Sequence, residues 1–245
     1  MAALLAVWSG PRNLSTALMR AFSSRPGTQV WDEPFYAHYL TSTGKEHPMR
    51  EAVLASQPHD EAAVVADLQA PLLGDYDLGY QKQMAHHLLP GMDRSWMSSQ
   101  THAFLIREPR AMLASLDQKL TGIGLEDTGL PQQVELFDRF HTQHGRPPLV
   151  VDSEDLARHP EQVLRALCTA ASVEFDPAML CWSEGPHPRD GAWAPHWYAN
   201  TWASTGFQPP GEAAPRQPLD PSLEPLLEQC QPLYAHLAEH RLVPR

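Results

Sequence analysis

The sequence predicts an α/β fold in which a parallel β-sheet, flanked by helices, forms a single domain. Short apolar runs recur along the 245 residues, and helical patterns follow them. A chain of this length can bury a substantial core in one large domain. Strands that alternate with helices pair in parallel and carry functional side chains at their carboxyl ends. We therefore expect the chemistry directly after each apolar run.

The expected strands are short runs of apolar residues, each lying ahead of a helical pattern as in a buried parallel sheet. The first run leads through a tight turn into a helix, and the fourth ends directly before Arg107. In chain order, the strands are expected over residues 3–8, 29–31, 78–81, 103–106 and 149–151.

Helices are expected where apolar side chains recur at helical spacing. Pro109 stands at the start of one helix, where its missing N–H costs nothing, whereas Pro225 and Pro232 break or kink the last. In chain order, the helices are expected over residues 14–22, 60–72, 84–89, 110–120, 132–143, 160–171 and, roughly, 221–240.

The single domain, residues 1–245, is expected to have three parts. Residues 1–181 form the core, residues 182–218 a Trp- and Pro-rich loop region over the site, and residues 219–245 a C-terminal helix. Large aromatic side chains are costly to leave in water, so the middle part is expected to be ordered. Its four tryptophans are Trp182, Trp193, Trp197 and Trp202.

The charge distribution favours a small anionic ligand. The formal net charge of −11 argues against nucleic acid or an anionic membrane as the partner. The first 25 residues nevertheless carry Arg12, Arg20 and Arg25 and no acidic residue. We therefore expect a positive site within an acidic protein.

Other sequence signals are weak. The first apolar run is too short to span a membrane and lacks a basic leader, so the expected location is the cytoplasm. The three cysteines form no CxxC pair, and the 13 histidines show no metal-ligand spacing. We therefore expect no metal site. The sequence does not indicate an oligomeric state.

The first functional motif follows the first expected strand. A turn from a buried strand into a helix presents unpaired backbone N–H groups and the positive helix end, which can hold an anion. Arg12 adds a fixed charge, and hydroxyl donors follow it. The alternative is an ordinary turn capped by Asn13 or Ser15. The motif comprises Pro11, Arg12, Asn13, Leu14, Ser15 and Thr16.

Two further motifs follow the fourth and fifth expected strands. Arg107 stands at the end of the fourth strand, directly after residue 106, and Ser115 lies eight residues on, so the two can converge on one phosphate. Asp152 ends the last strand and begins an acidic segment. It is interpreted as structural; the alternative is a Walker B metal site, which is disfavoured because no Lys precedes Ser15 as the Walker pattern requires.

These motifs, in this order and spacing over residues 3–181, resemble those of the sulfotransferase family, within the phosphate-loop (P-loop) superfamily. The resemblance implies that residues 11–16 bind the 5′-phosphosulfate of 3′-phosphoadenosine-5′-phosphosulfate (PAPS). It also implies that Arg107 and Ser115 bind the 3′-phosphate, with Arg189 and Gly191 in a segment that closes over it. Leu14 departs from the family pattern, because a glycine is usual there.

Transfer of a sulfuryl group requires a base for the acceptor and cations for the developing charge. We expect Arg12 and Lys82 to be the cations. Glu33 is the first candidate for the base, with Asp32 raising the pKa of Glu33 by like-charge repulsion; the alternative for this pair is a helix N-terminus. The rival bases, which follow the third strand, are His86 and His87.

The predicted function is transfer of a sulfuryl group from PAPS to a hydroxyl or amine of a small acceptor, without a metal. Aromatic residues after Glu33 suggest an aromatic or cationic acceptor, although core packing explains them equally well. The alternatives are an Mg²⁺-dependent small-molecule kinase on the same fold and a non-catalytic protein that binds adenosine phosphates.

Overall fold

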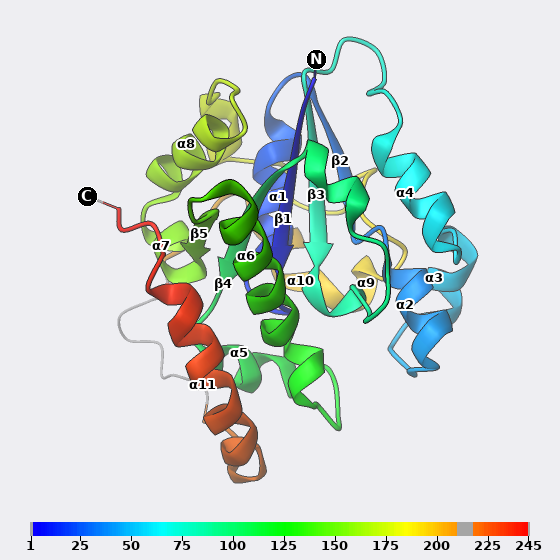
Figure 1. Ribbon diagram of the computed structural model, residues 1–245, viewed down its shortest axis with the longest axis vertical. Helices are drawn as coiled ribbons and strands as arrows, with labels where there is room; N and C mark the ends of the chain where they lie inside the picture. The colour runs from blue at the N-terminus through cyan, green and yellow to red at the C-terminus, as the bar shows by residue number, and fades with distance from the viewer. Residues whose placement is uncertain (1, 210–217, 245) are drawn as a thin grey trace.

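One five-stranded parallel sheet organises the molecule (Figure 1). The computed structural model describes residues 2–209 and 218–244. The strand order is β2-β3-β1-β4-β5, so β1 lies at the centre. All five predicted strands are confirmed and extend further than expected: β1 (Ala3–Ser9), β2 (Thr28–Asp32), β3 (Leu78–Met84), β4 (Thr101–Ile106) and β5 (Leu149–Asp152).

The register brings the ends of four strands to one edge. Ser9, the last residue of β1, lies opposite Met84 of β3 and Leu105 of β4. Asp32, the last residue of β2, lies opposite Lys82 of β3. Because the strands are parallel, the segments that follow them emerge together at the carboxyl edge of the sheet.

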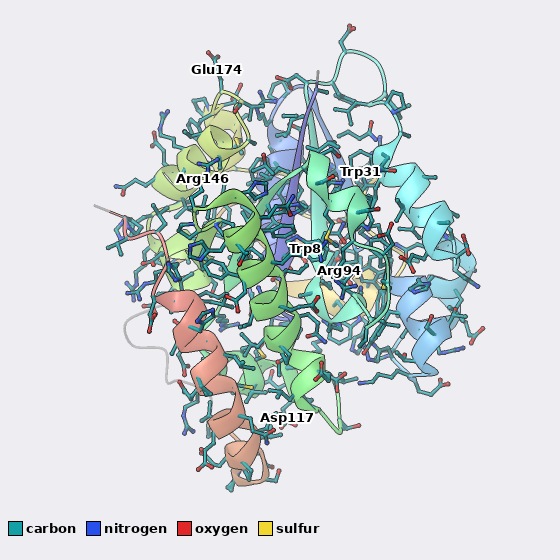
Figure 2. All side chains as sticks on the ribbon, viewed as in Figure 1. Trp8, Trp31, Arg94, Asp117, Arg146 and Glu174 are labelled. Atoms are coloured by element: carbon teal, nitrogen blue, oxygen red, sulfur yellow. The ribbon has the colours of Figure 1, made fainter. Side chains whose placement is uncertain are left out.

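Helices cover both faces of the sheet, because the side chains of each strand alternate between two cores. Leu5 and Val7 of β1 face a core formed with α1 (Ser15–Ser24), α7 (Ser153–Arg158) and α8 (Pro160–Ala170). Ala6 and Trp8 face the opposite core. Figure 2 shows Trp8 in the interior of the molecule, whereas Glu174 and Asp117 lie at its margin. The second core includes α4 (Glu61–Gln69), α5 (Pro109–Leu116), α6 (Leu130–His144) and α11 (Glu224–Ala238).

The expectation of a helix over residues 84–89 is wrong. β3 continues to Met84, and only the 3₁₀ turn η1 (Ala85–His87) follows it. Met84 completes the pairing with β1, so the strand continues to the carboxyl edge. The other 3₁₀ turns are η2 (Ser95–Ser99), η3 (Leu125–Thr128), η4 (Pro177–Leu180) and η5 (Pro221–Leu223).

Short helices that the sequence pattern did not reveal surround the carboxyl edge. They are α2 (Tyr36–Thr43), α3 (Arg50–Ser56), α9 (Ala194–Trp197) and α10 (Ala199–Trp202). The last two belong to the predicted Trp- and Pro-rich region, of which residues 210–217 lie outside the described residues. Trp193 and Tyr198 are buried there, packed with α2. Among the described helices, none has the length and apolar character needed to cross a membrane.

Candidate active site

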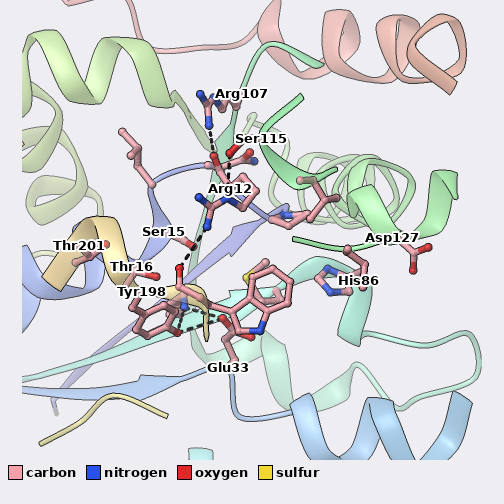
Figure 3. A pocket seen from close by; sticks show the side chains of 18 of the residues that line it. Arg12, Ser15, Thr16, Glu33, His86, Arg107, Ser115, Asp127, Tyr198 and Thr201 are labelled. Carbon is pink, nitrogen blue, oxygen red and sulfur yellow. Dashed lines mark hydrogen bonds and ion pairs between the residues drawn. The ribbon is translucent and has the colours of Figure 1, made fainter. Parts of the chain in front are cut away.

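A cavity of about 390 Å³ opens at the carboxyl edge of the sheet (Figure 3). Its walls come from the β1–α1 loop (residues 10–14) with the start of α1, the ends of β2 and β3, and α5, α9 and α10. Segments distant in sequence therefore meet at one site. The cavity includes twelve of the predicted site residues: Pro11, Arg12, Asn13, Leu14, Ser15, Thr16, Glu33, Lys82, His86, His87, Arg107 and Ser115.

The backbone of the β1–α1 loop is tightly constrained. Arg12 and Leu14 have φ angles of 62° and 66°, in the left-handed region that costs an L-residue about 1–2 kcal/mol. Leu14 thus adopts the conformation that a glycine would take without this cost. At Gly10, an added Cβ would lie 2.4 Å from the Thr128 carbonyl oxygen, so a glycine is required there.

The N-terminus of α1 has no side-chain cap. Its N-cap residue is Leu14, and Asn13 instead donates from Nδ2 to the Leu105 carbonyl oxygen at 3.2 Å. Capping by Asn13 therefore does not occur. The first N–H groups of a helix have no acceptor within the helix, so this end of α1 presents donors and a positive dipole to the cavity. Such an arrangement suits an anion.

Two arginines flank this helix end without a carboxylate partner among the described residues. Arg12 donates from Nε to Ser115 Oγ at 3.0 Å and from Nη1 to the Trp197 carbonyl oxygen at 3.3 Å. Arg107 donates to the Arg12 carbonyl oxygen at 2.5 Å. Burial, and then the charge of Arg107, lower the pKa of Arg12, and burial also lowers that of Arg107. A bound anion would neutralise both charges.

The other two arginines of the N-terminal segment serve the fold. Arg20 pairs with Asp190 at 2.7 Å, and Arg25 pairs with Asp77 at 2.8 Å. Neither arginine lines the cavity. The expectation that three arginines form the positive site is therefore wrong for two of them, because carboxylates distant in sequence neutralise their charges.

A buried network of charges lies at the base of the cavity. Lys82 Nζ donates to Asp32 Oδ1 at 2.9 Å and to Glu33 Oε1 at 2.7 Å, and its side chain is 1% exposed. The hydroxyl of Tyr198 contacts the same three side chains, and the Trp193 indole N–H donates to it at 2.9 Å. The side chains of Asp32 and Glu33 thus bind Lys82 and do not cap a helix, which decides against their alternative role.

Opposing effects set the protonation of this network. Burial alone would lower the pKa of Lys82, but the attraction of Asp32 and Glu33 outweighs burial and raises it, so the ammonium is charged. Burial raises the pKa of Glu33, with a smaller contribution from the like charge of Asp32, and the attraction of Lys82 opposes both. One ammonium thus faces two carboxylates, and Glu33 has an increased proton affinity.

His86 and His87 line the same cavity in neutral form. Burial lowers the pKa of His86 to about 3 and that of His87 well below its usual range. Both Nδ1 atoms are buried and have no hydrogen-bond partner within the described chain. Imidazoles with such low proton affinity are weak bases at neutral pH, which favours Glu33 over the histidines.

The family model "Sulfotransferase domain" matches residues 3–240. The chain belongs to the sulfotransferase family. Solved sulfotransferases share its fold at low sequence identity. The structure of a sulfotransferase from Alicyclobacillus acidocaldarius aligns with a TM-score of 0.59 and 18% identity, covering 99% of this chain and 98% of that one. The sulfotransferase domain of the Synechococcus PCC 7002 olefin synthase aligns with a TM-score of 0.52 and 17% identity, covering 93% and 94%.

Two curated relatives from Arabidopsis thaliana are longer than this chain. They are named branched-chain-amino-acid aminotransferase-like proteins 2 and 1, and they are 38% and 39% identical to it. Each match covers 95% of this chain but only 41% of the relative. This sulfotransferase-family chain thus spans less than half the length of these relatives.

Arg189 and Gly191, expected from the family resemblance to close over the 3′-phosphate, do not line the cavity with the arginines. They line a second cavity of about 350 Å³, which also contains Asp32 and Trp193. The Gly191 N–H donates to Asp32 Oδ2 at 2.9 Å. The segment around Gly191 therefore contacts the charged network at the base of the first cavity from the side of the second cavity.

Asp152 has the structural role that the sequence favoured. It caps α7 by accepting from the Glu154 N–H at 2.8 Å, and it accepts from the Tyr234 hydroxyl at 2.8 Å. Asp152 does not line the cavity. Within the part of the chain that the structure describes, no group of three His, Cys, Asp or Glu side chains has metal-binding geometry.

Several residues of the first cavity could not be identified from the sequence. Tyr198 is the most notable, because its hydroxyl contacts both carboxylates of the network. Its place in the Trp- and Pro-rich region was the only available signal, since nothing in the local sequence marks it. Tyr36, one of the aromatic residues after Glu33 that the sequence offered as a pocket wall, does line the cavity. The other lining residues missed include His47, Asp127, Asn200 and Thr201.

Proposed function

We propose that the chain transfers a sulfuryl group from PAPS to a hydroxyl or amine of a small acceptor. The observation that carries the proposal is that one cavity joins an uncapped helix N-terminus to a buried network of two carboxylates and a lysine. The two arginines that flank this helix end have no carboxylate partner among the described residues. The first part suits an anionic donor and the second suits proton removal.

The donor is proposed to lie along the β1–α1 loop. The N–H groups at the start of α1, Arg12 and the hydroxyls of Ser15 and Thr16 would hold the 5′-phosphosulfate. Arg107 and Ser115 would hold the 3′-phosphate. Arg12 contacts Ser115, and Arg107 contacts the Arg12 carbonyl oxygen. These contacts support the assignment, because they keep the three residues within one cluster.

The reaction is proposed to proceed by in-line displacement. The acceptor oxygen or nitrogen forms a bond to sulfur as the bond between sulfur and the bridging phosphate oxygen breaks. That oxygen leaves with the electron pair as part of adenosine 3′,5′-bisphosphate, stabilised by Arg12 and Lys82. Glu33 takes the acceptor's proton. Its increased proton affinity supports this role, because a base is most effective when its pKa approaches the working pH.

The Mg²⁺-dependent kinase receives less support. No lysine precedes Ser15 in the loop, and Asp152, which would hold the metal, is occupied in capping α7. The non-catalytic alternative also receives less support, because the buried Lys82 and Glu33 line the cavity at a cost in solvation that a simple binding site does not require.

Thermal shift measurements test the donor assignment. A ligand that binds only the native state stabilises it by about 2.7 kcal/mol at a hundredfold excess over Kd. We expect stabilisation by adenosine 3′,5′-bisphosphate and none by ATP with Mg²⁺. Stabilisation by ATP with Mg²⁺ alone would favour the kinase. Arg107→Ala should reduce the stabilisation by adenosine 3′,5′-bisphosphate, because it removes a proposed contact to the 3′-phosphate. Arg110→Ala is the control and should not reduce it, because Arg110 pairs with Glu224 and does not line the cavity.

A further inference from the structure

The Tyr198 hydroxyl is buried between the two carboxylates at the base of the cavity. It lies 2.8 Å from both oxygens of Asp32 and 3.3 Å from Glu33 Oε1. Trp193 Nε1 and Lys82 Nζ donate to it. The residue stands at the junction of α9 and α10, so the late segment of the chain reaches into the charged network (Figure 3).

The network has too few hydrogen-bond donors to supply Asp32 and Glu33 equally. A phenol has one proton to donate, and the oxygen of Tyr198 already accepts from Trp193 and Lys82. The shorter distances direct that proton to Asp32, not to Glu33. The Asp32 carboxylate thus accepts hydrogen bonds from Tyr198, Lys82 and the Gly191 N–H. In the described structure, Lys82 is the only donor within 3.0 Å of the Glu33 carboxylate.

We infer that Tyr198 is a positioning residue, which satisfies Asp32 and thereby leaves Glu33 as the carboxylate that takes the acceptor's proton. The inference rests on the proposed function, because only sulfuryl transfer requires a carboxylate to take a proton from an acceptor. The distribution of hydrogen bonds within the network stands independently of it.

The other charged groups around the network do not determine whether Asp32 or Glu33 takes the proton. Arg20 of α1 and Asp190 of the late segment face the network and pair with each other at 2.7 Å. The remaining titratable neighbours are neutral at pH 7: Tyr36 of α2, Tyr80 of β3 and His87 of η1. Lys82 therefore balances only one of the two carboxylates, and an unequal supply of donors decides which one is left unbalanced.

Tyr198→Phe tests the inference by removing one hydroxyl from a buried ring. Carbon-13 NMR of protein labelled at the glutamate side-chain carboxyl follows Glu33 directly, with Glu33→Gln identifying its resonance. We expect the titration midpoint of Glu33 to fall by about one pH unit, a tenfold loss of proton affinity, because Asp32 then competes for the proton. Tyr39→Phe is the matched control, since its hydroxyl contacts Asp127 outside the network.

An unchanged Glu33 midpoint in Tyr198→Phe, or an equal change in Tyr39→Phe, would overturn the inference. Incorporation of 3-fluorotyrosine at position 198 keeps the hydroxyl and makes it a stronger donor, so it tests the same idea if the Phe variant does not fold. The Glu33 midpoint should then rise, and a fall would contradict the inference. These titrations need neither donor nor acceptor, so a failure of the proposed sulfuryl transfer remains a separate result.

Discussion

Lys82→Met tests whether the buried network stabilises the fold as its geometry requires. Lys82 contacts Asp32 and Glu33 at 2.9 and 2.7 Å, and its side chain is 1% exposed. Removal of one partner from a buried ion pair costs about 3–5 kcal/mol, because a charge is left without compensation. Methionine retains most of the volume, so the expected loss at pH 7 comes mainly from two unpaired carboxylates.

The loss should depend on pH in a defined direction. Without the ammonium, burial raises the folded-state pKa of a carboxyl above its unfolded value of about 4. The folded variant then binds protons more tightly than the unfolded chain. Its loss of unfolding free energy relative to the wild-type protein is therefore small near pH 4 and grows as the pH rises. In the wild-type protein, the raised pKa of Lys82 contributes stability below its unfolded value of about 10.4, which is lost as the pH rises through the folded pKa.

Urea unfolding followed by tryptophan fluorescence between pH 4 and pH 8 measures this effect. Arg158→Met is the control, because Arg158 and its partner Glu154 are both exposed, at 39% and 54%, and such a pair contributes at most about 1 kcal/mol. A loss in Lys82→Met no larger than in this control, or one independent of pH, would refute the reasoning.

Three further predictions follow from the cavity. Leu14→Gly should raise the free energy of unfolding by about 0.5–1 kcal/mol in urea titrations, because it relieves a left-handed backbone; a loss would contradict that conformation. In calorimetric titrations, Arg107→Ala and Ser115→Ala should each weaken binding of adenosine 3′,5′-bisphosphate by about 1.5–3 kcal/mol and leave binding of adenosine 5′-phosphate unchanged. The control variant Arg110→Ala should leave binding of both ligands unchanged. Equal losses for both nucleotides would reject the 3′-phosphate assignment. His86→Asn should lower turnover less than tenfold, and a hundredfold loss would return the base assignment to the histidines.

The sheet and its carboxyl edge were predictable because their signals are local. An apolar run such as residues 3–8 indicates a strand, and a parallel sheet places the segments after its strands together. The carboxyl-edge positions of Arg12 and Arg107, together with the family resemblance, thus placed both in one site with Lys82 and Ser115, and all four line the first cavity. Leu14 stands where the family pattern has a glycine, and it adopts the left-handed conformation that a glycine takes without strain.

The remaining features depend on contacts between distant segments. The pairing of Arg20 with Asp190 removes one cation from the expected positive site, and it joins residues 170 positions apart. Tyr198 reaches Asp32 across 166 positions, with no local pattern to indicate it. Gly191, expected near the donor, instead contacts Asp32 from the second cavity. Sequence periodicity contains no information about such pairings.

Formation of adenosine 3′,5′-bisphosphate from PAPS, measured by chromatography in EDTA with pooled hydroxyl and amine metabolites, tests the central claim most directly. We expect acceptor-dependent formation of the product by the wild-type protein, and a loss of turnover of roughly 10²–10⁴ in Glu33→Gln with a hydroxyl acceptor. Donor affinity and thermal stability of the variant should be retained. Full activity of Glu33→Gln, or no acceptor-dependent product from the wild-type protein, would contradict the account.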